Sequence, residues 1–127
     1  MRAIPEKMKR DILEKYPNKC ARAMVFHDHE CQGRLTLEHV WTYGGPQINE
    51  VWAILKICAW AHDVDEHQDG GNLDKAKHQY ISVMLASPED LAKYPRKNWG
   101  AIRFGLQAAL AEQADLSALD KLRKCLR

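Results

Sequence analysis

Cysteine and histidine side chains concentrate in the middle of the chain. Residues 20–67 hold three of the four cysteines and five of the six histidines. Thiolate and imidazole are ligands that Zn²⁺ prefers, usually four in a tetrahedron. Cys20 and Cys31 are expected to bracket a hairpin whose closure brings them together, and Cys58 stands where a predicted strand becomes a helix. The pattern therefore predicts a structural Zn²⁺ site at these cysteines, the alternative being three buried thiols without a metal.

A second group of residues suits metal-assisted phosphodiester hydrolysis. Glu38 and His39 end a predicted strand, and His62 and Glu66 share one face of a predicted helix because they are four residues apart. The reaction needs a base for water and a cation that neutralises charge on the phosphate and the leaving oxygen. Imidazole is a good base near neutral pH, and a carboxylate with an imidazole can hold Mg²⁺ or Mn²⁺. Further acids crowd the turn around Glu66, so a solvated helix surface is its other interpretation.

The elements that position these residues can be read from apolar spacing and turn signals. The expected class is α+β and mostly helical, with two strands at residues 34–38 and 51–57 around a glycine loop at 43–46. Helices are expected at residues 5–16, 58–67, from Asn72, from Ser87, at 99–110 and at 116–126. Neither linkers nor repeats interrupt this order, so we expect a single domain over residues 1–127.

Three motifs resemble a known family. They are Arg-Leu-Thr-Leu-Glu-His-Val at 34–40, Val-Trp-Ala-Ile at 51–54, and Ile57-Cys58 followed by His62. In this order they resemble the ββα-metal core of HNH endonucleases, most closely the compact type of phages and prophages. The resemblance covers about residues 18–72, and residues 73–127 would form a helical C-terminal extension.

The resemblance implies a role for each matching residue. His39 would be the general base that activates water, and Glu38 would be a ligand of a catalytic Mg²⁺ or Mn²⁺. His62 would be a second ligand of that ion, and Glu66 a further one. Cys20, Cys31 and Cys58 would match the thiols of the family's structural zinc site.

The zinc site departs from the family pattern at one position. The family usually places a Cys or His just before its final histidine, and this chain has Ala61 there. Either His27 or His29 supplies the fourth zinc ligand, or the site is weakened or lost.

The middle asparagine of the motif, which orients the base histidine, is also displaced. Asn49 is the nearest candidate, although it lies farther from Cys58 than the usual spacing, and Gln47 is a second candidate. Both departures favour an alternative function, a catalytically degenerate zinc-containing module that binds nucleic acid. A helical interaction protein with incidental histidines is a further alternative.

Composition and charge bound the remaining possibilities. The chain has 127 residues, 46% hydrophobic and 28% charged, which indicates one folded domain. No apolar run reaches the roughly 20 residues of a membrane helix, and the N-terminus lacks an apolar signal region, so we expect a cytoplasmic protein. The resemblance implies that it belongs to a bacterial host or its phage. Residues 25–92 hold eleven acidic and four basic residues, whereas the segments on both sides are basic.

The basic ends are typical of phosphate-contacting arms around a metal centre, the alternative being solvated helix faces that happen to be basic. Together with the family resemblance they imply DNA as the partner. Phosphate contacts by Lys and Arg give salt-sensitive affinity that is independent of sequence. No helix has the character of a base-reading element, so we expect weak sequence preference or a preference for structured or branched DNA. The candidate contacts are Lys93, Arg96, Lys97 and Arg103 with Tyr94 and Trp99, and Lys7, Lys9 and Arg10 near the N-terminus.

Overall fold

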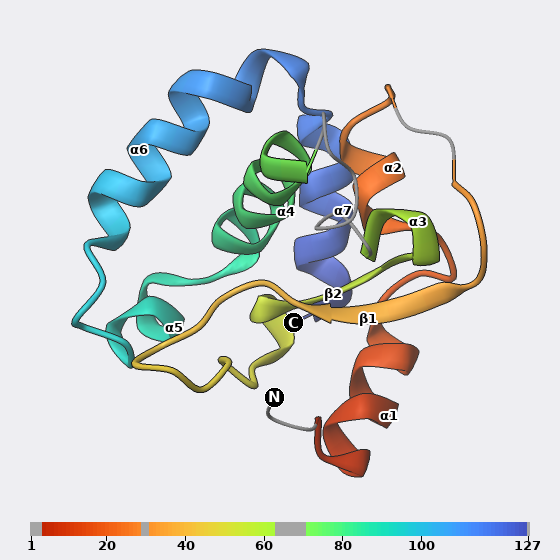
Figure 1. The fold of residues 1–127 in the computed structure, drawn as a ribbon, viewed down its shortest axis with the longest axis horizontal. Coiled ribbons are helices and arrows are strands. Elements are labelled where there is room, and N and C mark those ends of the chain that lie inside the picture. Colours follow the sequence, from red (N-terminus) through yellow and green to blue (C-terminus); the bar gives the residue numbers. More distant parts are fainter. Residues whose placement is uncertain (1–3, 29–30, 63–70, 127) are drawn as a thin grey trace.

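The computed structural model describes residues 4–28, 31–62 and 71–126, without the side chains of residues 62 and 71–74. It is a mostly helical α+β structure with a two-stranded antiparallel sheet, as predicted (Figure 1). In chain order the elements are α1 (Glu6–Lys15), α2 (Ala21–Val25), β1 (Leu35–His39), the 3-10 turn η1 (Val51–Ala53), β2 (Ile54–Cys58), α3 (Ala59–His62), α4 (Gly71–Leu85), α5 (Pro88–Ala92), α6 (Trp99–Leu110), the 3-10 turn η3 (Ala111–Gln113) and α7 (Leu116–Leu126). Within the described ranges, no helix has the length and apolar character that crossing a membrane requires.

The sheet forms close to where the sequence predicts it. Leu35 pairs with Cys58 at one end and His39 pairs with Ile54 at the other. The second strand starts three residues later than predicted, because residues 51–53 make a 3-10 turn before the chain extends. All five residues of β2 are buried, Lys56 included, which agrees with the largely apolar sequence of residues 51–57 from which the strand was predicted.

The predicted hairpin between Cys20 and Cys31 is wrong. Residues 21–25 instead form the short helix α2, in which Arg22 and Val25 are buried. The sequence of this segment is Ala-Arg-Ala-Met-Val, in which Ala, Arg and Met favour helix. A helix of five residues is too short to be stable alone, so tertiary contacts stabilise it. Cys20 and Cys31 thus lie on either side of a helix and a loop.

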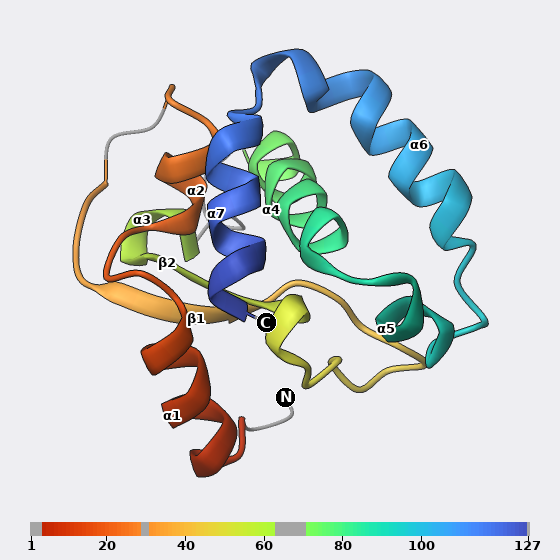
Figure 2. The same ribbon diagram turned by 180° about the vertical axis from the view of Figure 1, so that it is seen from behind.

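Helix α4 forms the centre of the helical half. Its Tyr80 and Ile81 are fully buried, and α2, α6 and α7 pack around it (Figures 1 and 2). In α7, Leu119 and Leu122 are buried and Leu126 is partly buried, whereas Leu116 is 61% exposed.

Local start signals predict the following helix correctly. Ser87 accepts a hydrogen bond from the backbone N–H of Asp90, and the Asp90 carboxylate accepts one from the backbone N–H of Ser87. With Pro88 at the first helical position, this capping box sets the start of α5.

A cluster of aromatic rings joins the β1–β2 loop to the segment around α5 and α6. Trp99 lies edge-on to Trp41 and Trp52, with ring centroids 5.1 and 5.9 Å apart. Tyr94 makes the same kind of contact with Tyr43, at 5.1 Å. The loop that follows His39 is therefore held against the C-terminal half rather than projecting from the sheet.

Candidate functional site

The three cysteines converge where α2, the loop after it and the β2–α3 junction meet. Their sulfur atoms all lie within 4.8 Å of one another. Cys20 and Cys58 are buried, Cys31 is exposed, and the backbone N–H of Cys58 donates to Cys20 Sγ at 3.3 Å. Sulfur ligands of a tetrahedral Zn²⁺ lie about 3.8 Å apart, since the Zn–S distance is about 2.3 Å. The three sulfur atoms are therefore close enough together to serve as three ligands of one zinc ion.

The electrostatics of this cluster also suit a cation. Burial of its sulfur atom and then the neighbouring Cys20 and Cys58 thiols raise the pKa of Cys31 to about 12, although the residue as a whole is exposed. Without a cation, thiolates this close would repel one another, so the Cys31 thiol keeps its proton at neutral pH. A bound Zn²⁺ reverses this preference because it displaces the protons and stabilises the thiolates.

The histidines proposed as the fourth ligand are not brought to this cluster within the described residues. His27 Nε2 lies 3.1 Å from the Met24 carbonyl oxygen and 3.1 Å from an Asp115 carboxylate oxygen, so it is engaged by α2 and the start of α7. His29 lies outside the described residues. In the described part of the chain, the three cysteines are the single group of three or more metal-ligand side chains this close together.

The backbone after Cys31 is bonded directly to α3. Ala59 N–H donates to the Arg34 carbonyl at 2.8 Å, and Trp60 N–H donates to the Gln32 carbonyl at 3.2 Å. Between these bonds, Gly33 adopts a φ of +82°, and a Cβ there would lie 2.9 Å from Ala59 Cβ. A glycine is thus required for the cysteine loop to approach α3 this closely.

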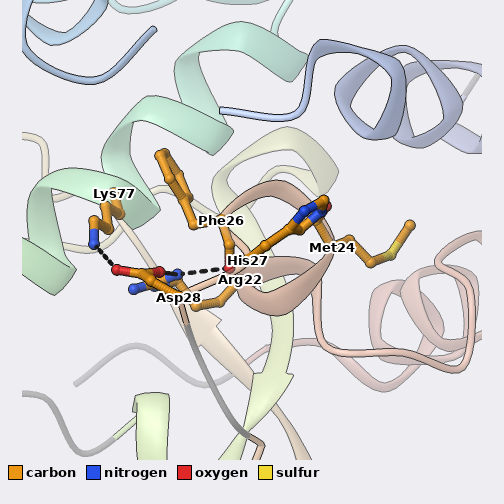
Figure 3. A network of polar contacts seen from close by, with 6 residues as sticks. All are labelled: Arg22, Met24, Phe26, His27, Asp28 and Lys77. Carbon is orange, nitrogen blue, oxygen red and sulfur yellow. Dashed lines mark hydrogen bonds and ion pairs between the residues drawn. The ribbon is translucent and has the colours of Figure 1, made fainter. Parts of the chain in front are cut away.

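An ion-pair network ties the same loop to α4. The Asp28 carboxylate lies 3.0 Å from Arg22 Nη1 and 2.7 Å from Lys77 Nζ, and Arg22 also donates to the Phe26 carbonyl (Figure 3). Both cations are buried and lie over the Phe26 ring. Partial burial alone would raise the pKa of Asp28, but hydrogen bonds from Lys77 and Arg22 and their charges lower it to about 2. The loop from α2 towards Cys31 is therefore anchored by a carboxylate that stays ionised.

The second predicted group centres on His39 at the end of β1. Its Nε2 lies 2.5 Å from Asn49 Oδ1, although ten residues separate the two in the chain. An amide oxygen can only accept, so this contact places a proton on Nε2 and leaves a lone pair on Nδ1. Asn49 was the first of the two predicted candidates. Gln47, the second, lines the neighbouring pocket.

Glu38, the residue before His39, meets a histidine that the sequence analysis did not assign to the site. Glu38 Oε2 lies 2.8 Å from Nδ1 of His78 on α4, and His78 is 2% exposed. A usable signal was present, because His78 shares a helical spacing with the buried Ile81, Ser82 and Leu85. That spacing places the imidazole on the inner face of α4.

An open pocket of about 330 Å³ lies over these groups. Its lining comes from β1, the following loop and α4. The lining residues are Glu38, His39, Val40, Thr42, Gln47, Lys75, His78 and Gln79.

The other predicted ligands of a catalytic cation are not placed. His62 ends α3, but its side chain is not described, and Glu66 lies outside the described residues. That the side chains of His62 and Glu66 lie beside Glu38 therefore remains a prediction.

Two of the predicted DNA-contact residues lie beside the pocket loop. Arg96 is stacked on Tyr43, with Cζ 4.4 Å from the ring centroid, and its backbone N–H donates to the Tyr43 hydroxyl. Lys97 Nζ lies 5.6 Å from the centre of Trp41. Since Thr42 lines the pocket between these two aromatic residues, Arg96 and Lys97 place positive charge near its rim.

No family model, curated protein or solved structure matches this chain. Three features of the structure bear on its function: the three thiols, the His39–Asn49 contact and the pocket that Glu38 lines.

Proposed function

We propose that the chain is a metal-dependent endonuclease of the HNH type that hydrolyses DNA phosphodiester bonds. In this proposal residues 18–72 form a ββα-metal core, with the three cysteines holding a structural Zn²⁺. The observation that carries the proposal is the contact between His39 and Asn49 at a pocket that Glu38 also lines.

His39 is the general base in this mechanism. The Asn49 amide oxygen keeps the proton on Nε2, so Nδ1 has the lone pair that can remove a proton from water. The hydroxide then attacks phosphorus, and the bond to the leaving oxygen breaks. Asn49 also fixes the orientation of the imidazole ring, so the base is already positioned when the substrate binds.

Glu38 is the proposed anchor of the catalytic cation, with His62 and Glu66 as the further ligands that the family resemblance implies. A bound Mg²⁺ or Mn²⁺ supplies charge neutralisation for the phosphate and the leaving oxygen. Glu38 is suited to this task because it lies next to the base in the chain and lines the same pocket.

The DNA backbone is proposed to cross the loop that carries Trp41 and Tyr43. Arg96 and Lys97, stacked on these rings, would contact phosphates that flank the scissile bond. Neither residue reads a base edge in this scheme, which agrees with weak sequence preference.

Nicking of supercoiled plasmid in Mg²⁺ or Mn²⁺ tests the proposal. His39→Ala should lower the rate at least about 100-fold, since a general base contributes roughly 10²–10⁴-fold. The matched control is His27→Ala, which removes an imidazole engaged with α2 and Asp115 and should leave the rate unchanged. Equal rates in the wild type and in His39→Ala would remove His39 from the mechanism.

One observation favours a second candidate, the degenerate zinc module that binds nucleic acid without cutting it. The Glu38 carboxylate already faces the buried His78 imidazole, and Ala61 replaces a usual zinc ligand. This candidate predicts no nicking by the wild type in either cation, together with DNA binding that is lost when zinc is removed. The endonuclease proposal predicts His39-dependent nicking by the same zinc-loaded protein.

A further inference from the structure

The floor of the pocket holds two polar groups that the proposed base does not use. Glu38 comes from β1 and His78 from α4, and their side chains are 14% and 2% exposed. Glu38 Oε2 and both ring nitrogens of His78 are buried and make no hydrogen bond within the described part of the chain. Buried polar atoms normally have partners, so this arrangement indicates a missing ligand.

The geometry does not fit a simple structural ion pair. Nδ1 of His78 and Oε2 of Glu38 are 2.8 Å apart, yet the ring N–H is not aligned to form a hydrogen bond. A protonated imidazole held only by this carboxylate would be expected to point its N–H at the oxygen. The short distance therefore needs another explanation.

Two ligands of one cation meet this requirement. Neighbouring ligands in an octahedral shell lie about 3.0 Å apart when each is about 2.1 Å from the ion. We propose that Glu38 and His78 are the protein ligands of a divalent cation on the pocket floor, with the remaining coordination positions facing the pocket. His78 is thereby assigned as a metal ligand in addition to those expected from the family resemblance.

The donor types select the cation. A carboxylate suits Mg²⁺ and Mn²⁺ equally, whereas an imidazole favours the transition metal. The site should therefore bind Mn²⁺ more tightly than Mg²⁺. The pocket, at about 330 Å³, has room for water or a phosphate oxygen to complete the coordination.

The role of this cation in hydrolysis rests on the proposed function, whereas the cation site itself does not. Mn²⁺ binding is therefore measured without DNA, by calorimetry and by the electron spin resonance of free Mn²⁺. The zinc-loaded chain is used so that the thiols are already occupied. Glu38→Gln and His78→Gln should each weaken Mn²⁺ binding at least about tenfold, the lower end of the loss when even outer-shell partners of a metal are removed.

His27→Gln is the matched control, because it makes the same change at a histidine that contacts Asp115 instead of the pocket. Its Mn²⁺ affinity should equal that of the wild type. Unchanged Mn²⁺ affinity in both pocket variants would overturn the assignment and leave a structural pair.

A second measurement covers the case in which His78→Gln fails to fold. In wild-type protein, substoichiometric Mn²⁺ should broaden the imidazole NMR signals of His78 and not those of His27. Absence of that broadening overturns the assignment. Mn²⁺ binding that needs both residues, without any nicking of DNA, would support the cation site and reject the endonuclease. Nicking of DNA, with Mn²⁺ binding unaltered in both variants, would support the endonuclease and reject the cation site.

Discussion

Asn49 Oδ1 meets Nε2 of His39 although Asn49 is not where the usual motif spacing would place it. The loop between the strands explains this. A bridge between Thr42 and Gln47 folds the loop back, with Gly44 and Gly45 at positive φ in its turn. The chain then returns past His39 before η1 begins, so the amide reaches the imidazole by a route that a fixed spacing does not anticipate.

Asn49→Ala is expected to slow plasmid nicking by about 10–100-fold, because the imidazole loses the group that sets its tautomer and orientation. Asn49→Asp keeps an oxygen acceptor and should retain more activity than Asn49→Ala. Single-turnover nicking rates measure both effects, with the thermal midpoint Tm as a check on folding. A wild-type rate in Asn49→Ala would show that the contact has no part in catalysis.

The purified protein is expected to hold one zinc ion per chain, bound by the three cysteines. Cys58→Ser should lose most of this zinc and lower Tm, since metal binding contributes directly to folding. Cys125→Ser is the matched control, because Cys125 is an exposed cysteine of α7 outside the cluster. Metal content by mass spectrometry and thermal melts with and without chelator give the measurement.

The opposite outcome is equally informative. Protein that carries no stoichiometric zinc and keeps its Tm in chelator would mean that the three thiols are structural. It would favour a helical interaction protein over both nucleic-acid functions.

Asp28→Asn should destabilise the fold by about 1–2 kcal/mol. Arg22 and Lys77 are buried and lose their carboxylate, but Asp28 itself is 57% exposed, so water screens part of the effect. Asp120→Asn, on an exposed pair with Lys124, is the control and should change stability by less than about 0.5 kcal/mol. Urea unfolding at pH 7 gives both values.

The ion pairs of Asp28 with Arg22 and Lys77 also predict that the stability of the fold depends on pH. The pKa of Asp28 falls from an ordinary 3.8 to about 2 in the folded state. Its stabilisation is therefore complete above pH 5 and is lost as the pH falls through 4 towards 2. The stability difference between wild type and Asp28→Asn should shrink over that interval. A difference that stays constant from pH 5 to pH 2 would contradict the assigned ion pairs.

Ser82→Ala should cost about 1–3 kcal/mol of unfolding free energy. Trp41 donates its indole N–H to Ser82 Oγ at 2.9 Å, and the Ser82 hydroxyl donates to the Trp52 carbonyl at 2.8 Å, all in buried surroundings. Removing the hydroxyl leaves a buried donor and a buried acceptor without this partner. Ser117→Ala, at an exposed position of α7, should be near neutral. A neutral Ser82→Ala would mean that water replaces the hydroxyl.

Lys97→Ala should weaken DNA binding similarly for all duplex sequences and lower the slope of log affinity against log salt by about 0.9. The physical reason is the loss of one phosphate contact beside the pocket loop. Lys121→Ala, at an exposed position of α7, is the charge-matched control. Fluorescence anisotropy over a salt series measures the slope, and an unchanged slope in Lys97→Ala would place the DNA elsewhere.

Local chemistry explains why several elements were predictable. The start of α5 depends on Ser87, Pro88 and Asp90, which are neighbours in the chain. The β2 strand was visible as an apolar run, and the convergence of Cys20, Cys31 and Cys58 was predicted even though the expected hairpin is a helix. The residues that determine the helix start and the strand are neighbours in the chain, and the three cysteines share a preference for the same kind of metal ion.

Contacts between distant segments account for what was missed. The pairing of Glu38 with His78 joins residues forty positions apart, and no local pattern in β1 points to α4. Helix α2 has five residues and is held by Asp28 and by packing, so its own propensity was too weak a signal. The exposure of Leu116 likewise depends on where α7 docks, which apolar spacing alone does not reveal.

The close approach at Gly33 restricts how this chain can diverge. Any side chain there would collide with Ala59 and would also have to adopt a left-handed backbone, so mutations at this position should be removed by selection while surface positions drift. Genomic relatives that retain the cysteine cluster are thus expected to carry Cys-Xaa-Gly at positions 31–33, followed by a buried strand that ends in cysteine. That short signature offers a search pattern for homologues too distant for overall identity to reveal.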